Sequence, residues 1–520
     1  MDNLRPILYI SLAFVLFLLW EAWLDHNQPP ETEIVATALT ENGQALDVPD
    51  APVGVQSAPV GSYDVPLNSE SAEDQTQFIT VKTDVFNIKI STTGGDIREL
   101  DLLKYPVDAK DPDNPVKFLQ DTPSKRFIVQ SGLLSKGAAP DHHAVFSAEK
   151  NEYELYPGED QLKVTLHWQD TNGVKVDKVY TFHRGSYVVD LEQIVINDSG
   201  ESWKGRQYRQ LQRTSGEESD SFFIYTYTGG VIYSDSEKYE KIDFSDMSLQ
   251  NLKRDVTNGW LAMIQHYFVA AIVPEKGGNE HFFSKSLNHD RYLLGAVSPE
   301  QIVAAGDQGA FKTELFIGPK LQNEMAKLAP GLELTVDYGM LTILAKPLFV
   351  LLDFIHQFVG NWGWSIVFVT LLIKLAFFPL SAKSYRSMAN MRRLQPRMVA
   401  LKERYADDRA GMAKATMELY KKEKINPVSG CLPMLLQIPV FIALYWVLLE
   451  SVELRQADFM LWINDLSSKD PYFILPLLMG ASMFVQHKLN PAPTDPMQAK
   501  MMMMMPFIFT IFFAFFPAGL

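Results

Sequence analysis

Residues 362–382 read WGWSIVFVTLLIKLAFFPLSA, an apolar stretch of 21 residues in which Lys374 is the one charged side chain. A helix needs about 20 mainly apolar residues to cross the roughly 30 Å of hydrocarbon in a bilayer. The stretch therefore predicts a transmembrane helix, and it decides the class of fold. Working outward, three further transmembrane helices are predicted over residues 428–450, 471–487 and 501–520.

The N-terminus predicts one more membrane segment. Pro6 to Trp20 is apolar and uncharged, Arg5 supplies a basic flank, and Trp20 and Trp23 suit a membrane interface. Because no small-residue cleavage site follows, residues 1–24 are predicted to be an uncleaved transmembrane anchor rather than a signal peptide.

Loop charge predicts the orientation of these spans. Residues 383–424 hold 12 Lys/Arg against five Asp/Glu, whereas residues 451–470 hold two against four. Since cytoplasmic loops carry the excess of basic residues, 383–427 is predicted to be a cytoplasmic basic helical hairpin and 451–470 a loop outside. The N-terminus and the loop 488–500 are then cytoplasmic.

The segment after the anchor divides into two parts. Residues 25–77 are predicted to be an acidic disordered linker, because positions 27–76 contain nine Asp/Glu, six prolines and no Lys/Arg. From residue 78 to 318, short β-branched and aromatic runs alternate with polar residues between Gly, Asn and Asp turns, which predicts a large antiparallel β-sandwich. Within it, the apolar run 260–274 is interpreted as buried strand.

Residues 319–361 are predicted to link the β domain to the membrane. A short connecting helix is followed by an amphipathic helix near residues 340–360, whose polar residues fall on one stripe. Its position before a span favours a helix lying in the outer interface. The alternative is a surface helix packed on the β domain.

Composition excludes several function classes. The net charge of −15 argues against nucleic-acid binding, and no phosphate-binding glycine motif is present. One cysteine, Cys431, excludes an intramolecular disulfide framework and a cysteine zinc site. Asp141-His142-His143 lacks a third ligand at metal-binding spacing. We therefore predict no catalytic residue, no cofactor and no metal, and the chain is predicted not to be an enzyme.

Lys374 is the most informative single residue. It lies about 13 Å along a helix from Lys383 at the predicted cytoplasmic end, too far for easy snorkelling. A lysine inside a span is costly unless it is hydrated or paired. The other predicted spans offer no carboxylate within their apolar stretches, so a water-filled cavity open to the cytoplasm is favoured. Thr370, one turn earlier, would line the same face.

The spans are accompanied by distinctive motifs: NWGWS (361–365), FPL (378–380), MRRLQP (391–396), NP (426–427), GCLPMLLQIP (430–439), SVELR (451–455) and TDPM (494–497). These motifs are similar to those of the YidC family (YidC/Oxa/Alb), the membrane-protein insertases of Gram-negative bacteria. The resemblance spans the chain and is most specific from Tyr338 onward. It implies a polytopic α-helical inner-membrane protein with a large periplasmic all-β domain of super-sandwich fold.

The resemblance also implies a function and a site. Family members insert and help fold inner-membrane proteins through a hydrated groove open to the cytoplasm, alone or with the Sec translocon. The matching groove positions are Thr370, Lys374, Ile438, Pro439, Phe441 and Phe513. The implied partners are nascent membrane proteins, the Sec translocon with its accessory components, the ribosome at the basic cytoplasmic regions, and the lipid bilayer, but not DNA. The family has a further helix and a basic tail, so the chain is expected to be truncated before a final helix.

Two other functions compete with this hypothesis. An ion- or proton-coupled transporter could use Lys374, but it would predict further intramembrane carboxylates or inverted repeats. A receptor would bind its ligand through the β domain, which would then be essential while the groove would be dispensable.

Overall fold

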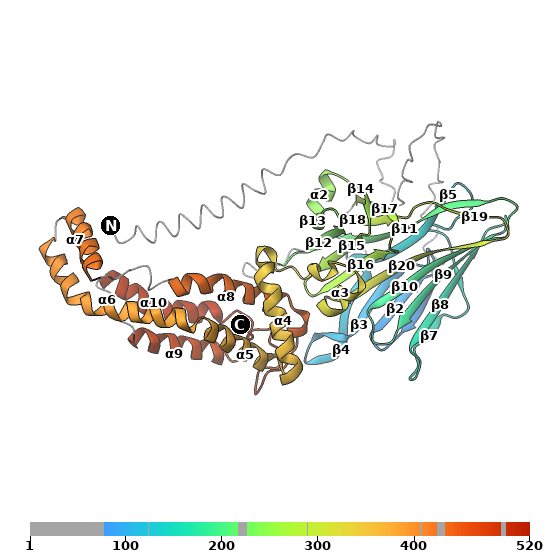
Figure 1. Ribbon diagram of the computed structural model, residues 1–520. Helices are drawn as coiled ribbons and strands as arrows, with labels where there is room; N and C mark the ends of the chain where they lie inside the picture. The colour runs from blue at the N-terminus through green and yellow to red at the C-terminus, as the bar shows by residue number, and fades with distance from the viewer. Residues whose placement is uncertain are drawn as a thin grey trace. The chain divides into compact units, whose positions relative to one another are not determined.

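The computed structural model describes residues 77–122, 124–216, 226–288, 290–405, 408–423, 432–489 and 496–520 (Figure 1). The predicted anchor (1–24) lies outside the described residues, as does nearly all of the predicted linker. The described chain forms two compact units. The larger contains the residues up to Val369, Ile442–Tyr472 and Phe516–Leu520, and the smaller contains Thr370–Phe441 and Phe473–Phe515.

The β domain consists of two large sheets, and its neighbouring strands are antiparallel except for β1 and β7. In the first sheet the order is β14-β17-β18-β11-β5-β4-β3-β2-β1-β7, with β19 paired to β11. Its strands are β1 (Phe78–Lys82), β2 (Phe86–Ser91), β3 (Ile97–Asp108), β4 (Asp111–Asp121), β5 (Arg126–Ser135), β7 (Glu152–Glu154), β11 (Trp203–Thr214), β14 (Lys253–Thr257), β17 (Asn279–Leu287), β18 (Arg291–Val297) and β19 (Gln301–Val303).

The second sheet has the order β13-β12-β15-β16-β20-β10-β9-β8-β6. Its strands are β6 (Ser147–Ala148), β8 (Gln161–Gln169), β9 (Val174–His183), β10 (Val188–Asn197), β12 (Gly229–Ser234), β13 (Lys238–Ile242), β15 (Trp260–Gln265), β16 (Phe268–Pro274) and β20 (Gln308–Pro319).

Strand sequence explains which faces are buried. In β9 and β10, buried and half-buried residues alternate strictly, so one face of each strand enters the core. Nearly every residue of β15 and β16 is buried, as expected for strands covered on both faces. The run 260–274, predicted as buried strand, is thus a hairpin of two buried strands, with Tyr267 at positive φ in its turn.

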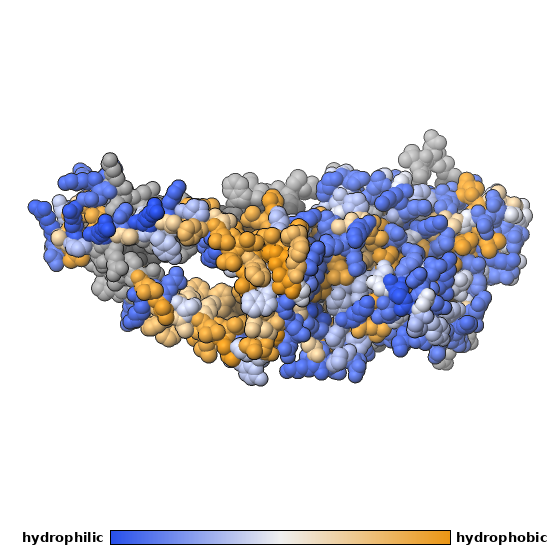
Figure 2. Space-filling model, turned by 60° about the horizontal axis from the view of Figure 1, so that its bottom comes forward, coloured by the Kyte–Doolittle hydropathy of each residue, from blue (hydrophilic) through white to orange (hydrophobic). Residues whose placement is uncertain are grey.

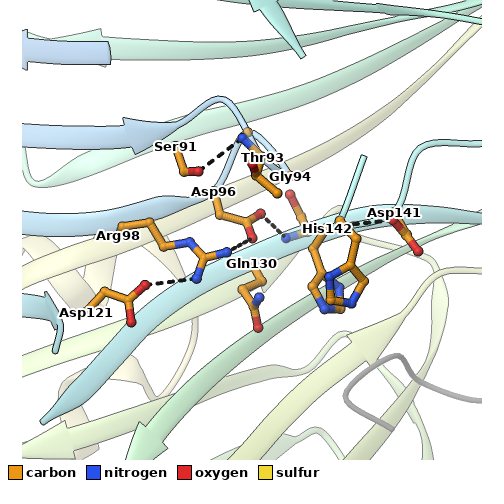
Figure 3. Close-up of polar contacts among 12 residues, drawn as sticks. Ser91, Thr93, Gly94, Asp96, Arg98, Asp121, Gln130, Asp141 and His142 are labelled. Atoms are coloured by element: carbon orange, nitrogen blue, oxygen red, sulfur yellow. Dashed lines mark hydrogen bonds and ion pairs between the residues drawn. The ribbon is translucent and has the colours of Figure 1, made fainter. Parts of the chain in front are cut away.

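Buried polar groups link the two sheets. Lys178 of β9 is fully buried, and its Nζ donates to the carbonyl oxygens of Gly94 (2.7 Å) and Ser131 (3.0 Å) and lies 3.4 Å from Asp96 Oδ1. Asp96 also accepts a hydrogen bond from Arg98, which reaches Asp121 (Figure 3). Burial lowers the pKa of Lys178 to about 8, against the opposing effect of the nearby carboxylate.

The helices follow the β domain in the chain, apart from α2. Their bounds are α2 (Phe244–Leu249), α3 (Gln322–Leu328), α4 (Thr342–Val359), α5 (Trp362–Ala376), α6 (Phe378–Arg404), α7 (Arg409–Lys422), α8 (Leu432–Glu450), α9 (Ile474–Leu489) and α10 (Pro496–Phe513). Short 3-10 helices are η3 (Leu332–Thr335), η4 (Gly339–Leu341) and η6 (Val452–Leu454). Figure 2 shows apolar residues gathered over the helical part and polar residues over the β domain.

The predicted span over 362–382 is not a single straight helix. Helix α5 ends at Ala376, and the chain bends by 57° into the first part of α6, Phe378–Ser387. Pro379 lies in the first turn of α6, where its missing N–H costs no helical hydrogen bond. Helix α6 then continues through Pro396, which lies inside it.

Length and composition single out few of the described helices as membrane spans. Residues Gly339–Val359, which include α4, are long and apolar enough to cross alone, and the bent pair α5 and α6 qualifies when taken together. Shorter apolar helices occupy Leu435–Glu450 and Lys500–Phe513. Sequence length alone therefore does not separate the predicted interfacial helix from the predicted spans.

Candidate functional site

Lys374 lies in the last turn of α5, two residues before the bend that ends the helix. Its side chain is exposed, and its Nζ lies 5.0 Å from the centroid of the Phe441 ring on α8. An ammonium over an aromatic face gains about 0.5–1 kcal/mol when exposed and more when desolvated. The contact therefore holds a positive charge beside an apolar helix without neutralising it.

All six predicted groove residues belong to the smaller unit. Thr370 is half-buried one turn before Lys374, so the two share a helical face. On α8, Ile438 and Phe441 are 45% and 44% exposed. Of these residues, the structure brings Lys374 and Phe441 into direct contact.

Pro439 gives α8 a local irregularity between these two exposed residues. It lies inside the helix and is itself exposed, and proline cannot donate to the carbonyl group four residues earlier, that of Leu435. The apolar surface of α8 thus contains a carbonyl that lacks its usual helical donor. In a membrane such a group is satisfied by water or a neighbouring chain.

Phe513 lies near the end of α10 and is half-buried, with its ring centroid 5.4 Å from that of Phe512. The position of α10 is fixed by close packing on α9. A Cβ at Gly480 would clash with the Thr510 hydroxyl, which donates to the carbonyl oxygen of Pro506 at 2.7 Å. Only glycine allows this approach, so Gly480 sets the packing of α9 against α10 and thereby supports the helix that carries Phe513.

The motif Asp141-His142-His143, which lacks a third metal ligand in the sequence, forms hydrogen bonds within the β domain. The Nδ1 atom of His142 lies 2.6 Å from the Tyr208 hydroxyl, and Asp141 Oδ1 accepts a hydrogen bond from the backbone N–H of His143. His142 is buried in the β domain beside the Asp96 network (Figure 3). Among the described residues, no group of three or more His, Cys, Asp or Glu side chains could hold a metal ion.

These features define a class: a membrane protein that joins a large two-sheet β domain to apolar helices, one of which carries an exposed lysine within its apolar run. Known proteins fit this class. The model of the YidC periplasmic domain matches residues 78–351, and the model of the 60Kd inner membrane protein matches residues 354–520.

Curated relatives match the whole chain. "Membrane protein insertase YidC" of Methylococcus capsulatus is 52% identical over 100% of this chain and 95% of the relative. The protein of the same description from Nitrosococcus oceani is 50% identical with the same coverage. A solved structure, "Active YidC insertase crystal structure with the first transmembrane domain resolved", covers 85% of this chain and 88% of its own, with 17% identity and a TM-score of 0.38.

The chain belongs to the YidC family of membrane protein insertases. This confirms the predicted fold class, the inner-membrane location and the periplasmic β domain. It also confirms that the chain is an insertase and not an enzyme, with nascent membrane proteins as its substrates, and it sets aside the transporter hypothesis.

Proposed function

We propose that the smaller unit contains a hydrated groove, open to the cytoplasm, through which substrates enter the membrane, alone or with the Sec translocon. The observation that carries the proposal is Lys374, which keeps an exposed ammonium group on an apolar helix and contacts Phe441. A charge in this setting is costly without water. Hydration of the groove would remove that cost and would admit a polar substrate segment.

The chemistry of the groove follows from its two kinds of lining residue. Lys374 and Thr370 offer a positive charge and a hydroxyl group to carboxylates on the translocated tail of a substrate, where reduced dielectric strengthens the attraction. Ile438, Phe441 and Phe513 offer apolar contact to the substrate helix. The hydrated path shortens the apolar barrier that the polar tail must cross. Partition of the apolar substrate helix into lipid then supplies the free energy for insertion.

We propose further that α4 lies in the outer interface rather than crossing the bilayer. Its polar residues face the periplasmic part: Asp353 accepts a hydrogen bond from Asn323 at 3.2 Å, and Lys346 pairs with Glu333 at 3.0 Å. Apolar side chains, including Phe358 at 75% exposed, remain outside this packing. The periplasmic family model extends to residue 351, within this helix.

The cytoplasmic partners would dock on the basic hairpin of α6 and α7. Asp408 caps α7 by accepting a hydrogen bond from Gly411 N–H at 2.9 Å, and Arg397 pairs with Glu423 at 2.5 Å, which joins the two helices. The excess of basic side chains suits a ribosome surface. A cysteine at Ser387 should resist an impermeant maleimide applied outside, whereas one at Ser467 should react.

The experiment compares one substrate carrying an acidic or a neutral translocated tail in Lys374→Arg, Lys374→Ala and Lys374→Glu backgrounds. Arginine should preserve insertion, alanine should slow the acidic-tail substrate most, and glutamate should be worse because attraction becomes repulsion. Lys383→Ala is the matched control, since Lys383 is an exposed lysine on α6. Equal losses for both tails in Lys374→Ala would refute the electrostatic role.

A further inference from the structure

The outer end of α8 carries a buried ion pair. Glu450 is the last residue of α8, and Lys320 follows β20 of the β domain. The Nζ of Lys320 lies 3.9 Å from Glu450 Oε2, and the two side chains are 1% and 4% exposed. Both residues lie within the larger unit, and burial lowers the pKa of Lys320.

Two contacts to backbone carbonyl groups lie next to this pair. The Nε2 atom of His266, in the β15–β16 turn, lies 3.1 Å from the carbonyl oxygen of Leu449. The adjacent carbonyl of Tyr267 accepts a hydrogen bond from the N–H of Lys320 at 2.9 Å. One hairpin turn of the β domain therefore contacts both the last turn of α8 and the lysine that pairs with its final residue.

The chain that follows α8 is held by the same domain. Arg455 Nη2 donates to the carbonyl oxygen of Pro106 on β3 at 2.7 Å, and Gln456 Nε2 donates to the same oxygen at 2.9 Å. We call these contacts, with the Lys320–Glu450 pair, the outer joint. It ties residues 449–456 to the β15–β16 turn, to the end of β20 and to β3.

A buried ion pair contributes little net stability, because desolvation of both charges offsets their attraction. Removing one partner is strongly unfavourable, since the other charge stays buried alone. Such a pair therefore adds little net stability, but arrangements that separate its partners are disfavoured. At the outer joint, the arrangement selected is the position of the last turn of α8 against the β domain.

We infer that Lys320 and Glu450 are positioning residues for insertion: they fix the outer end of α8 on the periplasmic domain, so that its inner half presents Phe441 and Ile438 to substrate. Phe441 precedes Glu450 by nine residues on this continuous helix, about 13 Å along its axis. Opening the joint would free this end of the helix and displace its apolar surface. The inference rests on the proposed groove.

The test is a mutant cycle of Lys320→Met, Glu450→Met and the double variant in the full-length chain. Each variant carries Cys431→Ser and a reporter cysteine at Ser451, which is buried beside the pair. Two quantities are measured: the rate of Ser451 cysteine labelling by an impermeant maleimide from outside, and insertion of one model substrate. Lys312→Met is the control, because its pair with Glu192 is 3.7 Å long but exposed (61% and 35%).

Each single variant should label roughly tenfold faster than the parent and insert several-fold less, because one buried charge is left unpaired. The double variant should return both quantities toward the parent, since it buries no charge and keeps side-chain volume. The control should change neither. Glu450→Asp, which keeps the charge on a shorter side chain, should fall between the parent and Glu450→Met, and it serves where a single variant does not accumulate.

Two results would overturn the inference. Faster labelling with unchanged insertion would show a joint that does not position the groove. A double variant as impaired as the single ones would show that the pair is not the element that matters. The groove proposal is tested independently by Lys374→Ala. That variant should reduce insertion of the acidic-tail substrate but should leave the labelling rate of the Ser451 cysteine unchanged.

Discussion

The β domain and the smaller helical unit differ in the side chains that they leave exposed and in the charges that they bury. The β domain encloses charges and pairs them, as in Lys178 with Asp96 and buried Arg209 with Glu280 at 3.0 Å. The smaller unit leaves apolar side chains exposed, among them Leu371, Leu375, Phe441, Phe507 and Ile511. The buried charges of the β domain thus find their partners within the domain itself, as expected for a domain that folds in water. The smaller unit needs lipid or a substrate helix to cover its surface, which suits an insertase.

Asp96→Ala tests whether the β domain depends on its buried charge pairs, and it should cause the largest loss of stability among the proposed variants. It removes the carboxylate beside the buried Lys178 and the acceptor of the Ser131 N–H. Leaving a buried charge without its partner costs about 3–5 kcal/mol of the free energy of unfolding. Pulse proteolysis of the β domain in urea, on the full-length chain, measures it.

The control for Asp96→Ala is Glu99→Ala. Glu99 pairs with Lys89 at 2.8 Å, but both side chains are more than 40% exposed. Its loss should cost less than about 1 kcal/mol. Similar losses for the two variants would mean that the buried network does not distinguish the β domain interior.

Gly480→Leu should destabilise the smaller unit by about 1–3 kcal/mol, because the added side chain cannot fit against Thr510. Thermal unfolding of the purified protein in detergent micelles measures the loss. Ala481→Leu is the control, since Ala481 is exposed on the same helix. If both substitutions are tolerated alike, α9 and α10 do not need their close approach.

Raising the pH should stabilise the β domain through Lys178, whose pKa is lowered from 10.5 to about 8. Between these values the folded amine is neutral while the unfolded one is charged, so the unfolded state binds more protons and stability rises with pH. From pH 8 to 9.5 the gain should be about 1–2 kcal/mol relative to Lys178→Met. Urea unfolding at the two pH values measures it, and parallel curves would contradict it.

Phe358→Ser on α4 should have the smallest effect on folding, within about 0.5 kcal/mol, because the side chain is 75% exposed. It should instead weaken contact with lipid. Quenching of a fluorophore on a cysteine at Val359 by brominated lipids should fall in the Phe358→Ser background. Unchanged quenching would argue against an interfacial α4.

The sequence predicted the fold class because both of its signals are local. Alternation marks half-buried strands such as β9, and uncharged runs mark membrane helices such as α8. The break after Ala376 was not predicted, because the apolar run continues through it. Pro379 was the available signal, since proline favours the first turn of a helix.

The candidate site also contains features that a local sequence pattern predicts and features that it cannot predict. Lys374 stands out in the sequence as a charge within an apolar run, whereas the other groove positions came from the resemblance and remain proposals. Its contact with Phe441 joins two helices far apart in the chain, so no local pattern could give it. The Lys320–Glu450 pair was missed for this reason, although Glu450 directly follows a long uncharged run.

The buried network around Lys178 has a consequence for the order in which a cell envelope is assembled. The one cysteine of the chain, Cys431, lies outside the β domain, so no disulfide bond links the two sheets, which are joined by apolar packing and by hydrogen bonds and ion pairs such as those of Lys178. Folding of the β domain therefore forms no disulfide bond and needs no thiol oxidant. An insertase built this way can mature before the membrane-bound oxidation machinery is in place.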